Sequence, residues 1–394
     1  MSKIEFLNLG RQPVTNNFLN NPNPKNEFFY TLKVSFGEQN KIVSLSNFLP
    51  PEKMFNETYA HRASMSKTMQ ISNYMFSNYV KKKFSPKKIL EIGSNDGIFL
   101  KNFNNIVRVG VEPCKNLALI TNKLGIKTYA NFWNTNLARK IINKYNTFEF
   151  IYSANTISHI HNLEETLSAI EISLSDNGIF VIEDPSLLDV LKKISYDQFY
   201  DEHAYVFSVL GISNLLLETE LEIFDVEKIS THGGSQRIYI KKKKNKLNIS
   251  QRVDNAIKSE LDFGMNKYET YKIFAKKVES SKKNLIKIFE KIKKNKNKII
   301  GYGATYKSAT VLNYCGINKD YIDYFIDTTV TKQGKYTPGT HIPIIKPPTN
   351  GLDSSINYAF LGAWNFRKEI FNKERKFIKL GGKFITHVPK PRII

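Results

Sequence analysis

Residues 88–100 read K-I-L-E-I-G-S-N-D-G-I-F-L, and this stretch decides the fold. Ile89 to Ile92 form a short apolar run that ends at a glycine, which is typical of a buried parallel strand. The turn that follows places Gly93 and Gly97 around three polar residues, and glycine permits a tight turn close to a ligand. A strand, a glycine-rich turn and a helix start predict a ligand-binding edge at the carboxyl end of a sheet.

The turn differs from the G-x-G-x-x-G pattern that binds pyrophosphate. Asn95 stands where that pattern has its second glycine, and Asp96 adds a negative charge where a pyrophosphate would sit. An acidic turn better suits a cofactor that is cationic or carries an amino acid. We also expect Asn95 or Asp96 to cap the helix that follows. The next strand, Val107 to Val111, ends in Glu112, and a carboxylate there can accept both ribose hydroxyls.

The motif E-x-G-x-x-x-G, followed by a strand that ends in Glu, resembles the S-adenosylmethionine (SAM) site of class I methyltransferases. The alternative is any doubly wound domain with a glycine turn. The resemblance implies SAM as the cofactor. The third strand ends at Asn131 and Phe132, where a polar atom and a ring can hold adenine, and the fourth ends at Asn155, at the edge where the strand ends converge on the cofactor. The cofactor-binding residues are then Glu91, Gly93, Ser94, Asn95, Asp96, Gly97, Glu112, Pro113, Asn131, Phe132 and Asn155.

Length and composition limit the class of protein. A chain of 394 residues predicts two or three domains. No apolar run approaches the roughly 18 residues of a membrane helix, and residues 1–10 include Glu5 and lack a signal-peptide core. We therefore expect a cytoplasmic protein without a membrane partner. Cys114 and Cys315 are the two cysteines, too few for a disulfide framework or a four-thiolate zinc site.

The formal charge of +22 raises the question of a nucleic-acid partner. The excess is mostly lysine spread along the whole chain, and its densest part, residues 241–298, reads largely as a lysine-faced helix. No aromatic-interleaved nucleic-acid motif appears. We expect no nucleic-acid partner, and the positive field also suits a small anionic substrate such as a nucleotide diphosphate.

Strand and helix patterns alternate between residues 84 and 244. This alternation predicts a parallel sheet that is covered on both faces. Strands are expected near Ile89, Val107, Thr128, Phe150 and Phe180, and helices near Leu100, Leu117, Leu137, Glu165 and Leu188.

Residues 1–83 read as a small leading segment. Leu9 to Leu19 is turn-rich, Tyr30 to Phe36 and Lys41 to Ser46 alternate as strands, and Lys67 to Val80 reads as a helix.

A second α/β unit is predicted at residues 298–394, after a charged helical linker at residues 245–297. Strand, G-Y-G-A loop and helix recur between Ile299 and Ile317, and the helix start with Lys307 suits a phosphate. Gly303 and Lys307 are therefore candidate substrate-binding residues, as is Arg237 in T-H-G-G-S-Q-R. Further strands are expected at 324–326, 358–362 and 382–388, with a helix near 366–377. The alternative is a domain that serves packing alone.

The stretch 196–208, Y-D-Q-F-Y-D-E-H-A-Y-V-F-S, holds most of the proton-handling groups. Tyr200, Glu202 and His203 lie within four residues of each other, and His159 follows another strand end. Each histidine also fits a hydrogen-bonded structural role. A metal site is not expected, because His159 and His161 lack a third ligand at a recognisable spacing.

Taken together, these stretches resemble SAM-dependent C-methyltransferases that act on nucleotide-linked keto-deoxysugars. The shared motifs are L-G-x-Q-P, E-I-G-S-N-D-G-x-F-L, the E-H of Y-D-E-H-A-Y-V-F-S, H-G-G-S-x-R, G-Y-G-A-x-x-K, K-Q-G-x-x-x-P-G-T-H-I-P and A-W-N-F followed by G-G-K-F. The resemblance implies a small N-terminal module, a class I methyltransferase domain and a C-terminal Rossmann-like domain, with the nucleotide-sugar between the last two.

Carried onto this chain, the resemblance implies His203 as the base, with Glu202 and Tyr200 beside it and His159 and Tyr59 completing the pocket. Three departures stand out. The family usually has H-E-H where this chain has Asp201 before Glu202, and it often has a Tyr where this chain has His61. Its N-terminal module normally binds zinc through four cysteines, which residues 1–83 lack.

The hypothesis is methyl transfer to a carbon next to a ketone. His203 removes the acidified proton, Glu202 orients the ring or raises its basicity, and Tyr59, Tyr200 or His159 donates to the enolate oxygen. The first alternative is O- or N-methylation of a sugar or related small molecule at the same SAM site. A SAM- or nucleotide-binding protein without catalysis and an RNA methyltransferase are the others. Monomer and homodimer both stay open.

Overall fold

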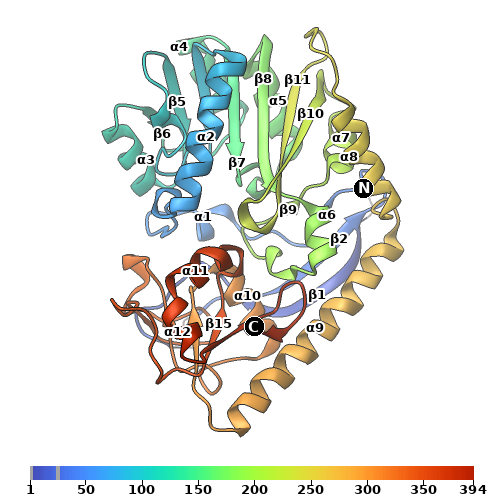
Figure 1. The fold of residues 1–394 in the computed structure, drawn as a ribbon. Coiled ribbons are helices and arrows are strands. Elements are labelled where there is room, and N and C mark those ends of the chain that lie inside the picture. The colour runs from blue at the N-terminus through green and yellow to red at the C-terminus, as the bar shows by residue number, and fades with distance from the viewer. Residues whose placement is uncertain (1–2, 24–26) are drawn as a thin grey trace.

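Three β-sheets organise the part of the chain that the structure describes (Figure 1). The structure is a computed structural model that describes residues 3–23 and 27–394. Helices flank the two larger sheets, and the small third sheet is antiparallel and comes mainly from the N-terminus. Figure 1 shows the seven-stranded sheet above the six-stranded one, with the N-terminal strands β1 and β2 beside their junction.

The seven-stranded sheet has the order β10-β11-β8-β7-β4-β5-β6. Neighbours from β8 to β6 are parallel, and β11 runs antiparallel to β8 and β10. This confirms the class I methyltransferase fold class, including every strand predicted between residues 84 and 185. The strands are β4 (Lys88–Ile92), β5 (Val107–Val111), β6 (Lys127–Tyr129), β7 (Phe148–Ala154), β8 (Leu174–Pro185), β10 (Leu221–Ile229) and β11 (Ser235–Lys242).

Helices cover both faces of this sheet, because successive residues of a strand point to opposite sides. Leu90 packs in a cluster with the buried residues of α4 and α5, whereas its neighbour Ile89 packs with Phe76 and Val80 of α2. The helices of this unit are α2 (Lys67–Phe84), α3 (Lys115–Lys123), α4 (Thr135–Tyr145), α5 (Leu163–Ser173), α6 (Leu187–Lys193), α7 (Val209–Leu215) and α8 (Gln251–Asp262).

Two local predictions about the first turn are wrong. No α-helix forms near Leu100, where the chain makes only a 3-10 turn, Leu100–Asn102. Neither Asn95 nor Asp96 caps it. Asn95 sits in the left-handed region with φ of 47°, and the Asp96 carboxylate accepts hydrogen bonds from Ser64 instead. The acidic turn is used to hold the N-terminal segment against the sheet.

The N-terminal sheet has the order β1-β2-β3-β9 and takes its last strand from a distant segment. Its strands are β1 (Lys3–Pro13), β2 (Phe29–Gly37), β3 (Val43–Leu45) and β9 (Tyr205–Val206), and the short helix α1 (Pro51–Met54) follows β3. The turn-rich prediction for residues 9–19 is therefore wrong for its first half, which lies in β1. Since β9 begins two residues after His203, the N-terminal sheet fixes one end of the segment that carries this histidine.

The C-terminal unit is a six-stranded sheet of order β14-β13-β12-β15-β16-β17 in which only β17 is antiparallel. It confirms the predicted second Rossmann-like unit. The strands are β12 (Ile299–Tyr302), β13 (Phe325–Ile326), β14 (Ile344–Ile345), β15 (Tyr358–Leu361), β16 (Lys383–Thr386) and β17 (Arg392–Ile393). Its helices are α10 (Tyr306–Cys315), α11 (Arg367–Lys373) and α12 (Arg375–Lys379).

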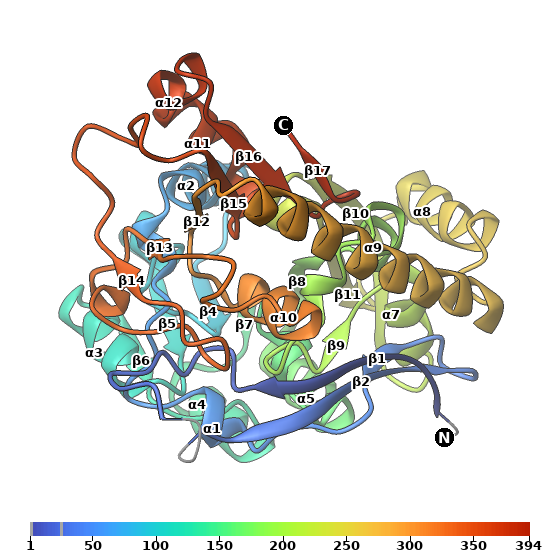
Figure 2. The ribbon, with the colours of Figure 1, turned by 90° about the horizontal axis from the view of Figure 1, so that it is seen from below.

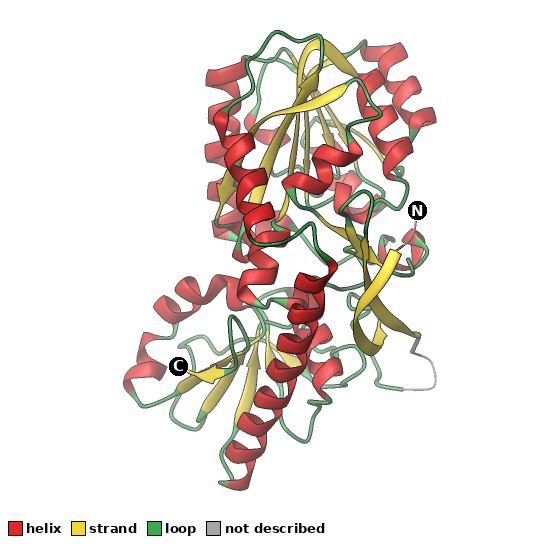
Figure 3. Cartoon of the chain, turned by 90° about the vertical axis from the view of Figure 1, so that its right-hand side faces the viewer, coloured by secondary structure: helices red, strands yellow, loops and turns green. Residues whose placement is uncertain are grey.

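Helix α9 (Tyr268–Lys294) joins the units and runs along the six-stranded sheet (Figures 2 and 3). The charged helical linker predicted at 245–297 thus contains two helices, α8 and α9. Buried residues of α9 share one apolar cluster with Phe6 and Phe36 of the N-terminal sheet and Ile299 and Phe360 of the C-terminal sheet. This shared core holds the units together around the site. The domain boundaries given above stay a prediction. Among the described residues, no helix is long and apolar enough to cross a membrane.

Candidate active site

The turn after β4 meets the end of β5 through the carboxylate of Glu112. The backbone N–H of Asn95 donates to Oε2 of Glu112 and that of Cys114 donates to Oε1, each at 2.9 Å. Gly93 has φ of 76°, and a Cβ there would strike the side chain of Thr156. The glycine is therefore required both by the backbone conformation and by the close approach of the loop after β7.

A cavity of about 710 Å³ opens at these strand ends and extends to the C-terminal unit. That volume lies in the range of small-molecule sites. Most of the predicted site residues line it: Tyr59, Glu91, Gly93, Ser94, Asn95, Glu112, Pro113, Phe132, Asn155, His159, Tyr200, Glu202, His203, Gly303 and Lys307. The structure thus brings residues from all three units to one space.

Four predicted residues do not line the cavity: Asp96, Gly97, Asn131 and Arg237. The most consequential is Arg237, because its guanidinium is already paired with Glu183 at 2.7 Å and with Glu227 at 3.3 Å. It also lies 3.9 Å from the ring centre of Phe76. The prediction that Arg237 binds a substrate phosphate is corrected: it ties β11 to β8 and α2.

The cavity wall beside the glycine turn fits SAM. Oε2 of Glu91 and Oγ of Ser94 are buried without a hydrogen-bond partner in the described chain, and both residues line the cavity. Burial, reinforced by Asp96 and Glu112, raises the pKa of Glu91 well above its usual value. A cationic amino group or a sulfonium would relieve this crowding of carboxyl groups. Glu112 keeps oxygen lone pairs for a ribose.

His203 is held in one tautomer by two hydrogen bonds. Its Nδ1 lies 2.8 Å from the carbonyl oxygen of Gln198, and a carbonyl only accepts, so Nδ1 carries the proton. The lone pair is therefore on Nε2, which accepts a hydrogen bond from the hydroxyl of Tyr200 at 2.8 Å. Burial lowers the pKa of His203 well below its usual value, and His159 and Lys307 add to this. The ring is a neutral base at neutral pH.

Glu202 does not orient His203, which corrects one part of the sequence prediction. Its Oε2 instead accepts a hydrogen bond from the hydroxyl of Tyr59 at 3.0 Å, and its Oε1 is buried without a partner. Burial raises the pKa of Glu202 well above its usual value. The orienting role falls to the Gln198 carbonyl, a backbone group that no side-chain pattern reveals.

Asp201 departs from the resembled family and faces the N-terminal module. Its carboxylate accepts hydrogen bonds from the backbone N–H and the hydroxyl of Thr15. Burial raises the pKa of Asp201 to about 6, while the Thr15 donors act against the rise. The residue before Glu202 thus anchors the segment to residues near the end of β1.

His159 lies between Phe55 and His203. Its ring stacks on Phe55 with centres 5.5 Å apart and lies 5.2 Å from the centre of His203. Burial lowers the pKa of His159 to about 3, and its Nε2 has no partner in the described chain. A neutral imidazole with a free nitrogen in the cavity can accept or donate one hydrogen bond to a ligand.

On the C-terminal side, Lys307 points inward from the first turn of α10. Its Nζ donates to the carbonyl of His232 at 3.3 Å, and burial lowers its pKa to about 8 although Asp197 opposes the shift. Gly303 has φ of 81°, and a Cβ there would meet Ala363. Both predicted residues therefore reach the cavity.

Sequence reasoning missed Gln198, His232, Tyr306 and Lys332, which also line the cavity. The signal for Tyr306 was present, since it precedes Lys307 in the quoted motif. Its ring centre lies 6.0 Å from that of Tyr200 and 6.5 Å from that of Tyr59. A signal was also present for His232 and Lys332, since each begins a quoted motif, H-G-G-S-x-R and K-Q-G-x-x-x-P-G-T-H-I-P. Nothing in the local sequence could reveal Gln198, because its role depends on contacts across the cavity.

Family models match three consecutive parts of the chain. A model of a zinc binding domain matches residues 1–55, a methyltransferase domain matches residues 60–226, and a C-methyltransferase C-terminal domain matches residues 230–389. The chain is also similar to the C-methyltransferase NovU of Streptomyces niveus, with 26% identity over 99% of this chain and 94% of that protein.

Two of the solved structures that match the chain each cover 44% of it. One is a SAM-dependent methyltransferase of Thermotoga maritima, described as a possible histamine N-methyltransferase, with 18% identity and a TM-score of 0.34 over 44% of this chain and 88% of that one. Another is the plantazolicin methyltransferase BpumL in complex with S-adenosylhomocysteine (SAH), with 14% identity and a TM-score of 0.35 over 44% of this chain and 82% of that one.

The zinc that the model of a zinc binding domain implies has no matching ligands in residues 1–55. Residues 1–55 contain neither cysteine nor histidine. Among the residues that the structure describes, no group of three or more His, Cys, Asp or Glu side chains is arranged to hold a metal. Val14, Leu49 and Met54 form an apolar cluster in this segment instead, packed against Tyr30 and Phe55.

Proposed function

This chain belongs to the family of SAM-dependent C-methyltransferases, and from that premise we propose that it methylates the carbon next to the ketone of a nucleotide-linked deoxysugar, with His203 as the base. The observation that carries the proposal is the fixed tautomer of His203, whose basic Nε2 shares one cavity with the SAM-binding turn. A neutral imidazole with a free lone pair can serve as the general base that carbon deprotonation needs.

Proton removal then involves Tyr200 as well as His203. A ketone acidifies the neighbouring C–H, and the hydroxyl of Tyr200 stands at the lone pair of His203 Nε2. We propose that the Tyr200 oxygen accepts the substrate proton while its own proton passes to Nε2. The positive charge that forms on the ring is short-lived, because burial strongly disfavours it.

The enolate oxygen needs hydrogen-bond donors that are already in place. Two polar atoms near His203 are buried without partners, Oε1 of Glu202 and Nε2 of His159. Burial raises the pKa of Glu202 well above its usual value, and we propose that its carboxyl group is protonated in the site and can donate. We propose that these two groups bind the developing oxyanion.

SAM, when bound, supplies an electrophilic methyl group on a positively charged sulfur. Glu112 would hold its ribose, and Glu91 with Ser94 would hold its amino-acid end, as argued from their unpartnered atoms. The chain's own contribution to this step is alignment, since the walls that carry Gly93 and His203 define the distance between donor and acceptor sites.

Lysines on the far side of the cavity support an anionic carrier on the acceptor. Lys307, Lys332 and Lys373 line the part formed by the C-terminal unit. Many other lysines lie on exposed helices and pair with acids of the same helix, as Lys258 does with Asp262 and Lys283 with Glu279. We therefore propose a small nucleotide-linked acceptor, without a nucleic-acid partner, as the reason for the positive cavity wall.

Hydrogen exchange in deuterated water tests the proposed base. A nucleotide-linked keto-deoxysugar incubated with the enzyme and SAH should lose its α-hydrogen to solvent, and His203→Gln should abolish exchange while SAM affinity stays unchanged. The matched control is His341→Gln, a histidine that pairs with Glu27 and does not line the cavity. An acceptor that lacks a ketone but is methylated by the wild type would contradict carbon methylation.

A further inference from the structure

The carbonyl that fixes His203 belongs to a 3-10 turn, Tyr196–Gln198, whose residues are all buried. The side chain of Gln198 is also engaged, because its Nε2 donates to the carbonyl of His232 at 2.9 Å. That same carbonyl accepts from Lys307 of α10. Gln198 is therefore held by groups outside its own turn, and the position of its backbone carbonyl depends on them.

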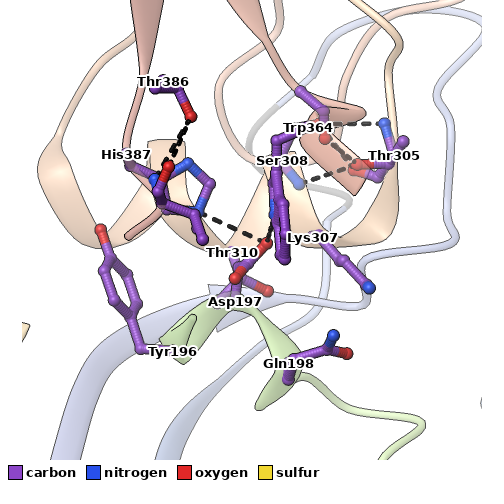
Figure 4. A network of polar contacts seen from close by, with 12 residues as sticks. Tyr196, Asp197, Gln198, Thr305, Lys307, Ser308, Thr310, Trp364, Thr386 and His387 are labelled. Atoms are coloured by element: carbon purple, nitrogen blue, oxygen red, sulfur yellow. Dashed lines mark hydrogen bonds and ion pairs between the residues drawn. The ribbon is translucent and has the colours of Figure 1, made fainter. Parts of the chain in front are cut away.

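Asp197, the residue before Gln198, is anchored by the C-terminal unit (Figure 4). Its Oδ2 accepts a 2.6 Å hydrogen bond from the indole Nε1–H of Trp364 and lies 3.4 Å from Nε2 of His387. Trp364 belongs to the turn Trp364–Phe366, and His387 follows β16. Burial alone would raise the pKa of Asp197, but His387, Lys307 and the indole N–H bring it below its usual value.

The contact between the turn at Asp197 and the C-terminal unit is buried and closely packed. Asp197 is 0% exposed, and removing a partner from a buried carboxylate is strongly unfavourable. Trp364 reaches it because Gly233 leaves room: a Cβ on that glycine would lie 2.2 Å from the indole ring. Tyr196, the residue before Asp197, places its hydroxyl 3.8 Å from Sγ of Cys315 in α10. Two successive side chains thus contact the C-terminal unit.

We propose that Asp197 is a positioning residue: by fixing its turn to Trp364 and His387, it holds the Gln198 carbonyl against Nδ1–H of His203 and keeps the base in its reactive tautomer. The C-terminal unit, which also supplies cavity walls, thereby controls whether His203 presents its lone pair at Nε2. The inference rests on the proposed role of His203 as base. It adds Asp197 as the residue that keeps His203 in one tautomer.

The tautomer of His203 can be read directly. Histidine-labelled full-length protein with SAH bound should give a nitrogen resonance pattern in which Nδ1 is protonated and Nε2 is not, assigned with His203→Gln. We expect Asp197→Ala to lose this pattern in favour of mixed tautomers. Asp197→Asn should retain it, since its side-chain oxygen can still accept from Trp364. Retention of the single tautomer in Asp197→Ala would overturn the proposal.

The turnover number kcat provides the second test of this proposal. With an acceptor that the wild type methylates, Asp197→Ala should lower kcat about 100-fold, in line with the loss of a positioned base, and leave SAM affinity unchanged. If Asp197→Ala does not fold, Trp364→Phe, which removes the indole donor and part of the ring, should lower kcat about tenfold with the same tautomer change. An unchanged kcat and tautomer in Trp364→Phe would reject the proposal.

Glu27→Gln is the matched control. Glu27 is buried, accepts from the backbone N–H of Gly339 and pairs with His341, so it also joins distant segments, but it lies outside the cavity. It should change neither the His203 signals nor kcat, and an equal loss in this variant would show that Asp197 acts only through general stability. The tautomer measurement needs no acceptor, so it tests the role of Asp197 independently of the hydrogen-exchange experiment. In that experiment, exchange retained by His203→Gln would show that another group is the base.

Discussion

The hydroxyl of Tyr59 donates a 3.0 Å hydrogen bond to Oε2 of Glu202, although the two residues are 143 positions apart in the sequence. Both are buried, with Tyr59 8% and Glu202 1% exposed. The bond occupies one carboxyl oxygen and leaves Oε1 for a ligand. The N-terminal segment therefore determines which carboxyl oxygen of Glu202 is left without a partner.

Tyr59→Phe should slow methyl transfer while leaving SAM affinity unchanged. The variant removes only the donor and frees the Glu202 carboxyl to turn away from the substrate. A hydrogen bond between uncharged groups is worth about 0.5–1.5 kcal/mol, so kcat should fall by roughly 2- to 10-fold. Initial rates at saturating SAM measure this. A kcat equal to that of the wild type would contradict the role given to Glu202 as a donor.

SAM affinity should depend on Glu112. Glu112→Gln keeps the shape of the side chain but removes the charge and one acceptor, while backbone donors from Asn95 and Cys114 remain. We expect SAM to bind about tenfold more weakly in calorimetric titrations. Glu57→Gln is the control, since Glu57 pairs with Lys115 on the exposed surface. Equal affinities in both variants would argue against ribose binding at Glu112.

The sequence predicted correctly those parts of the fold that depend on short stretches of the chain. Mainly apolar runs such as 89–92 and 148–154 favour buried strands, and Gly93 marks the turn. The helix near Leu100 failed because Asn95 adopts a left-handed conformation and Asp96 is used by Ser64. Propensity could not foresee a contact with a residue 32 positions away.

The predictions for the site divide in the same way: local spacing identified some residues, and contacts between distant segments decided the others. Tyr200, Glu202 and His203 were found from their spacing, and they do line one cavity. Adjacency suggested that Glu202 orients His203, but the chain turns there and Glu202 reaches Tyr59 instead. The Gln198 carbonyl has no side-chain signature, and Arg237 had the right chemistry for phosphate but satisfies Glu183. Long-range pairing decided each of these cases.

Stability should not depend on zinc. Residues 1–55 lack cysteine and histidine, and the segment is fastened by hydrogen bonds from Thr15 to Asp201 and by Glu27 with His341. Purified protein should carry no stoichiometric zinc by elemental analysis, and excess EDTA should leave the Tm unchanged. A bound zinc whose removal lowers the Tm would show that the described residues rearrange to coordinate it.

His159 should make the protein less stable in acid. Burial lowers its folded pKa to about 3, below the usual 6.5, so the unfolded chain binds more protons between these values and stability falls as the pH falls through this window. At pH 5 this amounts to about 2 kcal/mol. Urea unfolding at pH 7 and pH 5 should show a smaller loss in His159→Asn than in the wild type. Equal losses would place His159 in a solvated setting.

Tyr306 should set how the acceptor fits. It is half-buried in the cavity wall at the start of α10, and its ring lies near those of Tyr200, Tyr59 and His61. Lys332 places its ammonium 5.5 Å from the centre of the Tyr306 ring, which holds the ring in place. Tyr306 therefore brings the C-terminal unit next to the proposed base.

Tyr306→Phe removes only the hydroxyl, so KM for the acceptor should rise by roughly 3- to 10-fold with a smaller change in kcat. Tyr314→Phe, on the same helix but outside the cavity and packed near Lys282, is the control and should behave as the wild type. Tyr306→Ala should widen the cavity and admit acceptors with an added methyl group, measured as the ratio of kcat/KM for the two acceptors. An unchanged ratio would mean that Tyr306 supports the wall without touching the acceptor.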